Sequence, residues 1–301
     1  MQKNTHSSHF ELPFPSVLTV AFQSASEFLH VQPDTKLHIV RSYPALPVNS
    51  ETTDASEKIT LIFLHFWGGS SNTWAPVREL VAPQFPTLSL DFRGWGQSTG
   101  PDDRGAFSIA HLADDVEAVI THCKIGRCIV VGHSMGAKVA SAVAGRRTVS
   151  GLLGVALVAP APPTPLVLPE TMREQQIHAY DTAQSAEFVV RNVLSAGGLS
   201  DVTVEAVVAD AVGGSEWAKA GWLNYAMAED VVSLARDISV PVAVYAGGKD
   251  VVEPLARVEQ EVCGNNKGAT LAVLPDSGHL MPLECPEELG RHILNFARSV
   301  T

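Results

Sequence analysis

Short apolar runs along the chain predict buried strands, and segments with helical spacing lie between them. The strand-like runs are at 59–64, 87–91, 128–131, 152–158, 240–246 and 270–274. The helical patterns are at 73–81, 108–122, 137–144, 254–262 and 286–299. Strands that alternate with helices are typical of a mostly parallel sheet covered on both faces. The pattern therefore predicts an α/β fold.

The start of the chain shows alternation instead of buried runs. Residues 17–22 and 36–43 alternate well enough to predict two strands in a hairpin-like pair. Residues 1–16 predict a loosely held arm, and the prolines and acidic residues of 44–58 predict an exposed loop.

The strand–helix rhythm stops at a proline-rich segment, 159–165. From there to about residue 230 the sequence contains helix-like pieces, separated by glycines, and no strong strand. We interpret 160–230 as a helical insert between two parts of one core, 1–159 and 231–301.

Composition limits the classes of partner and compartment. The chain has 301 residues, of which 46% are hydrophobic and 18% are charged, with a formal net charge of −11. Such a charge disfavours nucleic acid and anionic membrane surfaces as partners. The four cysteines form no C-x-x-C pair and suggest free thiols in a reducing compartment. With no secretory signal pattern and no apolar run of membrane-span length, we expect a soluble cytoplasmic protein. A homodimer is left open.

The 128–131 run leads into Gly132-His133-Ser134-Met135-Gly136, a G-x-S-x-G pentapeptide. A strand that turns sharply into a helix places the serine on a strained bend with its hydroxyl exposed. Glycines on both sides avoid collisions across the turn. The segment predicts Ser134 as a nucleophile, and the alternative is a tight structural turn.

A serine hydroxyl needs a base within hydrogen-bond reach. His279 follows the last predicted strand, so it should share the carboxyl edge of the sheet with Ser134. Alternatively, it is a capping or loop histidine.

The base needs an acid that fixes its tautomer. Asp250 fits because it follows the 240–246 strand, although it could instead cap a helix near Pro254. Asp276 and Glu253 are weaker candidates. Asp91 lies in a tight turn and predicts a structural role.

An oxyanion hole needs two preorganised N–H donors. The Met135 N–H at the helix start is one candidate. The second should follow the 59–64 strand, where we choose Phe66, with Trp67 as the fallback.

These motifs together resemble the α/β-hydrolase family. The resemblance rests on the order Ser134, Asp250, His279, on His-Phe-Trp-Gly-Gly from His65, and on Asp-x-Arg-Gly-x-Gly-x-Ser from Asp91. It covers nearly the whole chain after about residue 36. It implies a sheet of about eight strands, a helical cap over roughly 160–230, a Ser-His-Asp triad, an acyl-enzyme intermediate, and neither cofactor nor metal.

Two features refine the resemblance. The family's oxyanion strand usually ends in His-Gly, but here Phe66 follows His65, which could narrow the acyl pocket or change which amide serves. The elbow carries Ser134 where haloalkane dehalogenases and epoxide hydrolases carry Asp, so those activities are disfavoured.

The expected substrate is a small, uncharged, hydrophobic ester or lactone. The motifs carry no cationic cluster, and Arg93 should brace its own turn. The candidate substrate-binding residues are Trp67, Trp95, His133, Trp217, Trp222, Tyr225 and Met281, with Phe66 and Met135 beside them. The alternatives are a C–C bond hydrolase or perhydrolase with the same triad, and a non-catalytic ligand-binding protein.

Overall fold

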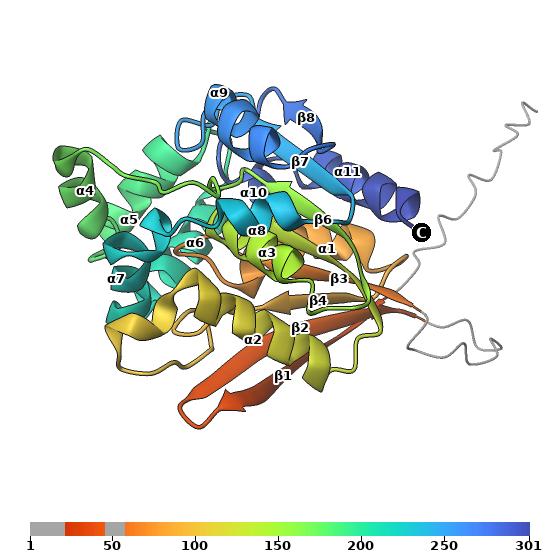
Figure 1. Ribbon diagram of the computed structural model, residues 1–301. Helices are drawn as coiled ribbons and strands as arrows, with labels where there is room; N and C mark the ends of the chain where they lie inside the picture. The colour runs from red at the N-terminus through yellow and green to blue at the C-terminus, as the bar shows by residue number, and fades with distance from the viewer. Residues whose placement is uncertain (1–21, 46–57) are drawn as a thin grey trace, which may run out of the picture.

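The computed structural model of the protein describes residues 22–45 and 58–301. Eight strands form one sheet in the order β1-β2-β4-β3-β5-β6-β7-β8. Only the β1–β2 and β2–β4 pairs are antiparallel. The strands are β1 Phe22–Gln32, β2 Thr35–Pro44, β3 Ile59–Leu64, β4 Thr87–Leu90, β5 Arg127–His133, β6 Leu152–Val158, β7 Val242–Gly247 and β8 Thr270–Leu274. The predicted eight-stranded, mostly parallel sheet is confirmed (Figure 1).

The first described strand, β1, covers residues for which the alternation predicted no strand. The expected strand at 17–22 lies outside the described residues except for Phe22, and β1 runs from there to Gln32. Its residues are exposed or half-buried throughout, because β1 is an outer strand that pairs only with β2. Pairing rather than burial makes this segment a strand, so the apolar pattern did not reveal it. The predicted arm, 1–16, and most of the predicted loop, 46–57, also lie outside the described residues.

Helices cover both faces of the sheet. Helices α2 (Ile109–His122) and α3 (Met135–Arg146) pack on one face, and α1 (Ala75–Val81), α10 (Met281–Glu284) and α11 (Pro286–Ser299) pack on the other. A short 3₁₀ turn, Ser71–Trp74, leads into α1. Between β7 and β8, α9 (Leu255–Arg257) continues as the π-helical turn Val258–Val262 and the 3₁₀ turn Cys263–Asn265. The predicted helices therefore exist, with their ends moved by a few residues.

Helix α2 shows why the periodic pattern worked. Ser108 caps it, with its hydroxyl oxygen accepting the His111 N–H at 3.1 Å. The apolar stripe of the helical pattern at 108–122, which includes Leu112, Val116 and Ile120, is buried against the sheet. A capped helix with one apolar face has a single favourable way to pack.

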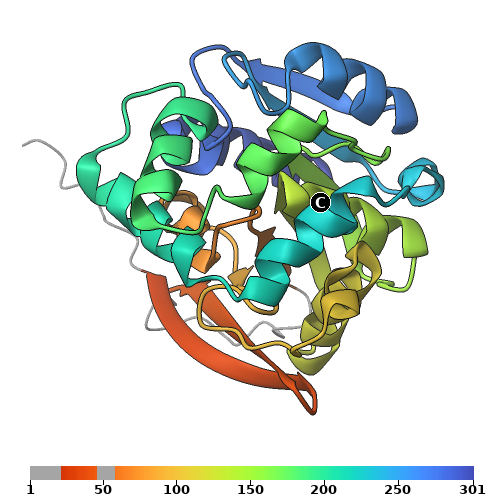
Figure 2. The same cartoon turned by 90° about the vertical axis from the view of Figure 1, so that its left-hand side faces the viewer.

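Between β6 and β7 the described chain is helical and contains no strand, as predicted. The elements are α4 (Glu170–Ile177), α5 (Ala183–Val189), the π-helical turn Val190–Leu194, α6 (Asp201–Gly213), α7 (Glu216–Asn224), the 3₁₀ turn Ala226–Ala228 and α8 (Val232–Asp237). Helices α4 to α7 gather at one end of the molecule, whereas α8 lies against α3 (Figures 1 and 2).

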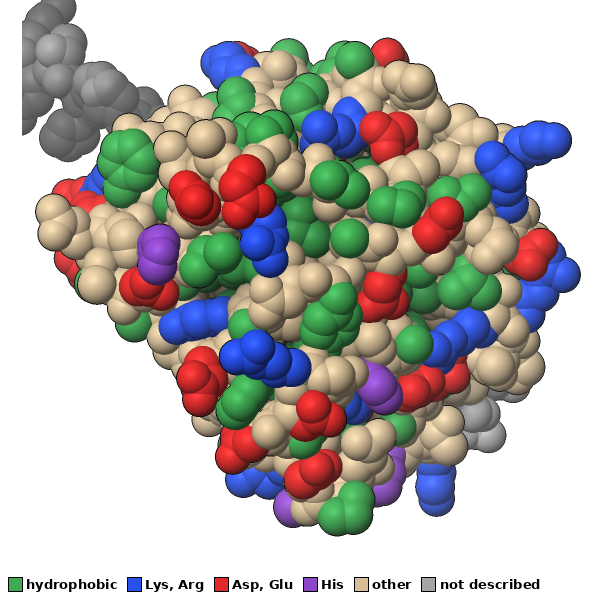
Figure 3. All heavy atoms as spheres, turned by 60° about the vertical axis from the view of Figure 1, so that its left-hand side comes forward, with side chains coloured by type: hydrophobic (Ala, Val, Ile, Leu, Met, Phe, Trp, Pro, Cys, Tyr) green, Lys and Arg blue, Asp and Glu red, His purple; other side chains and the backbone are tan. Residues whose placement is uncertain are grey.

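The insert side of the surface carries charges of both signs between scattered hydrophobic side chains (Figure 3).

Within 22–45 and 58–301, no helix is long and apolar enough to cross a bilayer. All four cysteines are free thiols, and Cys128 alone is fully buried.

Candidate active site

The strand-to-helix turn at Ser134 has the strained backbone that the pentapeptide predicted. Ser134 has φ 54° and ψ −115°, between the end of β5 and the start of α3. A Cβ on Gly132 would lie 2.2 Å from the carbonyl oxygen of Gly136, and a Cβ on Gly136 would lie 2.6 Å from that of His65. Only glycine fits at both positions. The backbone strain at Ser134, of about 1–3 kcal/mol, is therefore not increased by steric collisions from its neighbours.

His279 and Asp250 form a buried pair beyond the ends of β8 and β7. His279 Nδ1 lies 2.8 Å from Asp250 Oδ2, and both side chains are at most 2% exposed. The other carboxylate oxygen, Oδ1, accepts the N–H groups of Val252 at 2.8 Å and Glu253 at 3.0 Å. Because an ionised carboxylate only accepts, Nδ1 carries the hydrogen and Nε2 is free to accept a proton.

The pair shifts the pKa values of both partners toward their charged forms. Burial by itself would raise the pKa of Asp250, but His279 and the amides of Glu253 and Val252 more than offset it, and the pKa lies below its usual value. Burial would lower the pKa of His279, but Asp250 first, then Glu253 and Glu284, hold it above its usual value.

His133 joins the turn at Ser134 to the loop that carries His279. Its Nε2–H donates to the carbonyl oxygen of His279 at 2.7 Å, and the two rings lie 5.3 Å apart. Burial lowers the pKa of His133 to about 3, so the imidazole is neutral. The residue before Ser134 thus holds the backbone of the predicted base.

Ser134 itself is buried, with 8% of its surface exposed. Within the described chain its hydroxyl makes no hydrogen bond to the His279 imidazole. Catalytic hydrogen bonds are often long or poorly aligned before substrate binds. The structure therefore places the serine next to the residue that holds His279, without a closed hydrogen bond between the two side chains.

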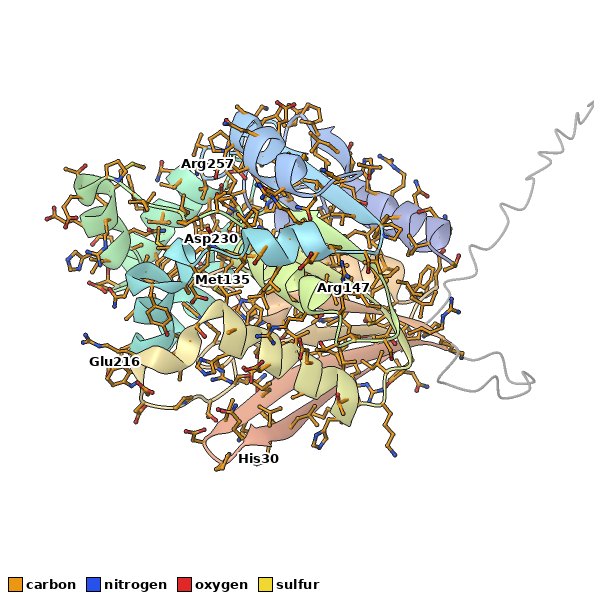
Figure 4. All side chains as sticks on the ribbon, in the orientation of Figure 1. His30, Met135, Arg147, Glu216, Asp230 and Arg257 are labelled. Carbon is orange, nitrogen blue, oxygen red and sulfur yellow. The ribbon has the colours of Figure 1, made fainter. Side chains whose placement is uncertain are left out.

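Neither of the two predicted oxyanion donors has an acceptor among the residues that the structure describes. The Met135 N–H is the first of α3, where no intrahelical partner exists. The Phe66 N–H likewise donates to no described residue, whereas its carbonyl oxygen accepts His65 Nδ1–H at 2.6 Å and the Gly69 N–H at 3.0 Å. Figure 4 labels Met135, which lies where α3 begins.

His65, which begins the His-Phe-Trp-Gly-Gly motif, was not among the predicted site residues, but it bonds to the backbone of the loops after β3 and β4. Burial is the main reason why the pKa of His65 is lowered to about 4. The imidazole is therefore neutral, so one ring nitrogen donates a hydrogen bond and the other accepts one. Its Nδ1–H holds the Phe66 carbonyl, and its Nε2 accepts the Phe92 N–H at 3.0 Å. These bonds fix the loop that carries the second candidate donor.

Most of the candidate substrate-binding side chains belong to one large apolar cluster that includes residues of both the sheet and the insert. This cluster contains Met135, Trp67, Trp95 and Trp222, with Trp217 and Tyr225 at its margin. The Trp67 ring lies 4.3 Å from the Tyr180 ring and is tilted by 33° against it, and its indole N–H donates to the carbonyl oxygen of Lys219. The Tyr225 hydroxyl bonds the backbone at Arg104 and Phe107, which ties α7 to the loop before α2.

Two candidates lie elsewhere. Phe66 joins a smaller cluster with Val190, Leu194 and Val207 of the insert and Leu280 beside the histidine. Met281 is fully buried with Phe63, Trp74 and Leu289 on the face that α1 and α11 cover. The contacts of Met281 are therefore those of a core residue.

The sequence reasoning did not foresee the state of Glu253. This side chain is 2% exposed, and burial raises its pKa to about 7 even though His279 and Arg257 oppose the shift. Arg257 Nη1 lies 3.3 Å from Glu253 Oε2. In the sequence, the position of Glu253 three residues after Asp250 was the only indication that this side chain lies near His279.

Asp91 has the structural role that we predicted, whereas Arg93 does not brace its own turn but contacts α2 and the segment before it. Arg93 forms a buried, two-pronged ion pair with Asp115 at 2.6 and 2.7 Å. Asp91 accepts the backbone N–H groups of Ser71 at 2.5 Å and Gln97 at 2.9 Å. Asp91 therefore joins the loops after β3 and β4, whereas Arg93 ties the loop after β4 to α2.

A profile of the alpha/beta hydrolase family matches residues 61–291. The chain belongs to this family.

Among curated relatives, the chain is 24% identical over 249 residues to the dihydrolipoyllysine-residue acetyltransferase component of the acetoin cleaving system of Pseudomonas putida, covering 79% of this chain and 63% of that protein. It is 24% identical over 254 residues to the bifunctional esterase/perhydrolase DCH of Acinetobacter calcoaceticus, covering 79% and 91%. The chain spans less than two thirds of the length of the first curated relatives that it matches.

Among solved structures, the enol-lactonase from Burkholderia xenovorans LB400 aligns with a TM-score of 0.75 at 21% identity, over 90% of this chain and all of that one. This likeness shows the shared fold.

Proposed function

We propose that the protein is a serine hydrolase that cleaves a small carboxylic ester or lactone through an acyl-enzyme. One observation carries the proposal: the imidazole of His279 is held by the Asp250 carboxylate at 2.8 Å, while its backbone is tied to the residue that precedes the strained Ser134. Membership of the alpha/beta hydrolase family supports the proposal, and so does the likeness to a curated relative that is named an esterase.

In the proposed reaction, the Ser134 hydroxyl attacks the carbonyl carbon while His279 Nε2 takes its proton. The tetrahedral intermediate collapses, the bond to the leaving oxygen breaks, and the imidazolium gives its proton to that oxygen. A water molecule, deprotonated by the same nitrogen, then attacks the acyl carbon. The bond to the Ser134 oxygen breaks, that oxygen takes the proton back from the imidazolium, and the acid is released. Asp250 holds the hydrogen on Nδ1 and stabilises the imidazolium.

The free N–H groups of Phe66 and Met135 are the proposed oxyanion donors. Each such donor is worth about 10²–10³-fold in turnover. The His65 bond to the Phe66 carbonyl presets this peptide before substrate arrives, so little reorganisation is needed. We expect the Phe66 side chain, which belongs to an apolar cluster with Val190 and Leu194, to narrow the space for the acyl group.

We further propose that residues 160–230 act as a cap over the site. The Tyr180 hydroxyl donates to the Trp67 carbonyl oxygen at 3.1 Å, and the Ser70 hydroxyl donates to Asp210 at 2.5 Å. The cluster of Phe66 with Val190 and Leu194 is apolar. An apolar lining and a serine that is 8% exposed favour a small uncharged substrate.

Labelling with a fluorophosphonate tests the nucleophile. We expect the probe to modify Ser134, and Ser134→Ala to abolish labelling at this position together with turnover of short aryl esters. Ser141→Ala is the matched control, because this serine lies on the same helix with its hydroxyl bonded to the Ala137 carbonyl. Folded protein with no label at Ser134 would overturn the proposal.

Perhydrolysis with the same triad is the second candidate, because one relative is named an esterase/perhydrolase. A panel of esters, lactones and β-diketones, each with and without hydrogen peroxide, separates ester cleavage from perhydrolysis and from C–C bond cleavage. A ligand-binding protein without catalysis would instead bind tightly, turn over nothing, and be unaffected by Ser134→Ala.

A further inference from the structure

A second Ser-His-Asp chain of hydrogen bonds lies on the β1–β2 hairpin, built from Ser26, His38 and Asp91. Ser26 Oγ lies 2.6 Å from His38 Nε2, and His38 Nδ1 lies 2.8 Å from Asp91 Oδ2. The three residues come from β1, β2 and the loop after β4. None of them belongs to the site at Ser134.

The order of donors and acceptors suits activation of a hydroxyl. Asp91 is 2% exposed at its side chain and accepts N–H groups from Ser71 and Gln97 as well as from His38. Burial alone would raise the pKa of Asp91, but His38 and these amides more than offset it and leave the pKa below its usual value. An ionised carboxylate holds the hydrogen on His38 Nδ1, so Nε2 accepts the Ser26 hydroxyl proton.

The open edge of the sheet supplies one N–H donor at this serine, the N–H of Ser26 itself. In β2, His38 directs its N–H to Ser98 and its carbonyl oxygen to the Asp91 N–H, on the β4 side. Pairing directions alternate along an antiparallel ladder, so Ile39 bonds toward β1, opposite Glu27. Ser26, the next residue along β1, therefore turns its own N–H outward, where no described strand lies.

Two side chains complete the surroundings. The exposed Gln97 places its amide nitrogen 3.4 Å from His38 Nε2, within reach of an oxygen bound at this point. The Phe28 ring, 46% exposed, lies 5.2 Å from the His38 ring and offers an apolar surface for an acyl or aryl group.

This cluster is open to solvent, unlike Ser134. Ser26 is exposed, whereas His38 is 3% exposed at its side chain. The hairpin projects from the sheet beyond α2, with the labelled His30 near its tip, well away from Met135 at the start of α3 (Figure 4). Bulky or surface-bound acyl donors can therefore reach Ser26 without movement of the insert.

We propose that Ser26 is a second activated serine, which accepts acyl groups from activated esters by transfer assisted by His38 and Asp91. The Ser26 oxygen bonds to the acyl carbon, its proton passes to His38 Nε2, and the bond to the leaving alcohol or phenol breaks as that group takes the proton. Water attacks the acyl-serine by the reverse proton route and regenerates the hydroxyl. No further reactant is needed.

Ser26 lies in regular extended backbone and has no helix start behind it, so its transfer should be slower than that at Ser134. A positioned base still contributes about 10²–10⁴-fold over an unassisted hydroxyl. Ser24 supplies the comparison, because it is exposed on the same strand and its hydroxyl oxygen accepts the Ser42 hydroxyl at 3.1 Å, with no histidine bonded to it among the described residues.

The test uses the full chain with Ser134→Ala, treated with a fluorophosphonate and with an aryl acetate, followed by peptide mapping. We expect modification at Ser26 at least about 100-fold faster than at Ser24, as assistance by a general base implies. Ser26→Ala in the same background should remove it, and Ser24→Ala should not. This outcome is independent of whether Ser134 is the nucleophile of the proposed hydrolase.

His38→Gln provides the second measurement. This variant, made with Ser134 intact, is judged folded by circular dichroism and by turnover at the Ser134 site, and should lose modification at Ser26. Equal rates at Ser26 and Ser24, no modification of either, or unchanged modification in a folded His38→Gln variant would overturn the proposal. If that variant does not fold, the Ser26 and Ser24 rates decide alone.

Discussion

Replacing Asp250 by Asn tests whether this carboxylate sets the proton position on His279. An Asn side chain has nearly the same size, so its oxygen can keep the N–H bonds of Val252 and Glu253, now 2.8 and 3.0 Å long. Its amide nitrogen then faces His279 Nδ1, across the present 2.8 Å contact. An amide nitrogen only donates, so the imidazole hydrogen must move from Nδ1 to Nε2. The nitrogen that should accept the serine proton is then already occupied.

We expect Asp250→Asn to lower kcat by about 10²–10⁴-fold with little change in KM, because the acid and the base act as one unit. The pH profile gives a second readout. Asp250 opposes the effect of burial and raises the pKa of His279. Without the negative charge, burial dominates, and the acidic limb of the kcat/KM profile should move to lower pH. Steady-state hydrolysis of an aryl ester across pH measures both effects.

Asp276→Asn is the matched control for this experiment. Asp276 lies in the same loop as His279 but is exposed and bonds Lys249 at 2.8 Å. We expect full activity from this variant. Wild-type kcat in Asp250→Asn, or a loss that occurs in Asp276→Asn instead, would refute the assignment of Asp250 as the orienting acid.

Two further substitutions probe the surroundings of Ser134. Gly136→Ala would place a methyl group 2.6 Å from the backbone oxygen of His65, so we expect a loss of about 1–3 kcal/mol in the free energy of unfolding, measured by urea titration. Burial lowers the pKa of Lys138 to about 8, although nearby carboxylates, Glu229 first, raise it. Between about pH 8 and 10.5 the unfolded chain therefore binds more protons, and stability should rise with pH relative to Lys138→Met. A parallel pH dependence in the two proteins would contradict this reasoning, as would unchanged stability of Gly136→Ala.

The features that the sequence predicted well depend on neighbours along the chain. The turn at Ser134 needs only two glycines and an apolar strand, and it has the expected strained backbone. Helix α2 begins at its capping Ser108 and buries the expected stripe. Local conformational preference and periodic burial act over a few residues, so their signals survive in the one-dimensional pattern.

The pairing of polar groups that are distant in the sequence was harder to predict. Asp250 and Glu253 are both acidic residues after the same strand, yet one meets His279 and stays ionised while burial raises the pKa of the other to about 7. From its position after a predicted strand, the sequence favoured Asp250 as the acid but did not exclude Glu253 or Asp276. Which carboxylate faces the imidazole depends on how the loops after β7 and β8 pack.

The hairpin shows the same limit more clearly. Ser26 lies in a segment without an apolar pattern, His38 is one histidine of eleven, and Asp91 was identified only as a turn residue. Their convergence requires β2 to pair with both β1 and β4 in one register. Periodicity and turn chemistry in the sequence specified the elements and the bend at Ser134. Contacts between residues tens of positions apart decided which side chains meet, because sheet register and loop packing are set by the whole fold.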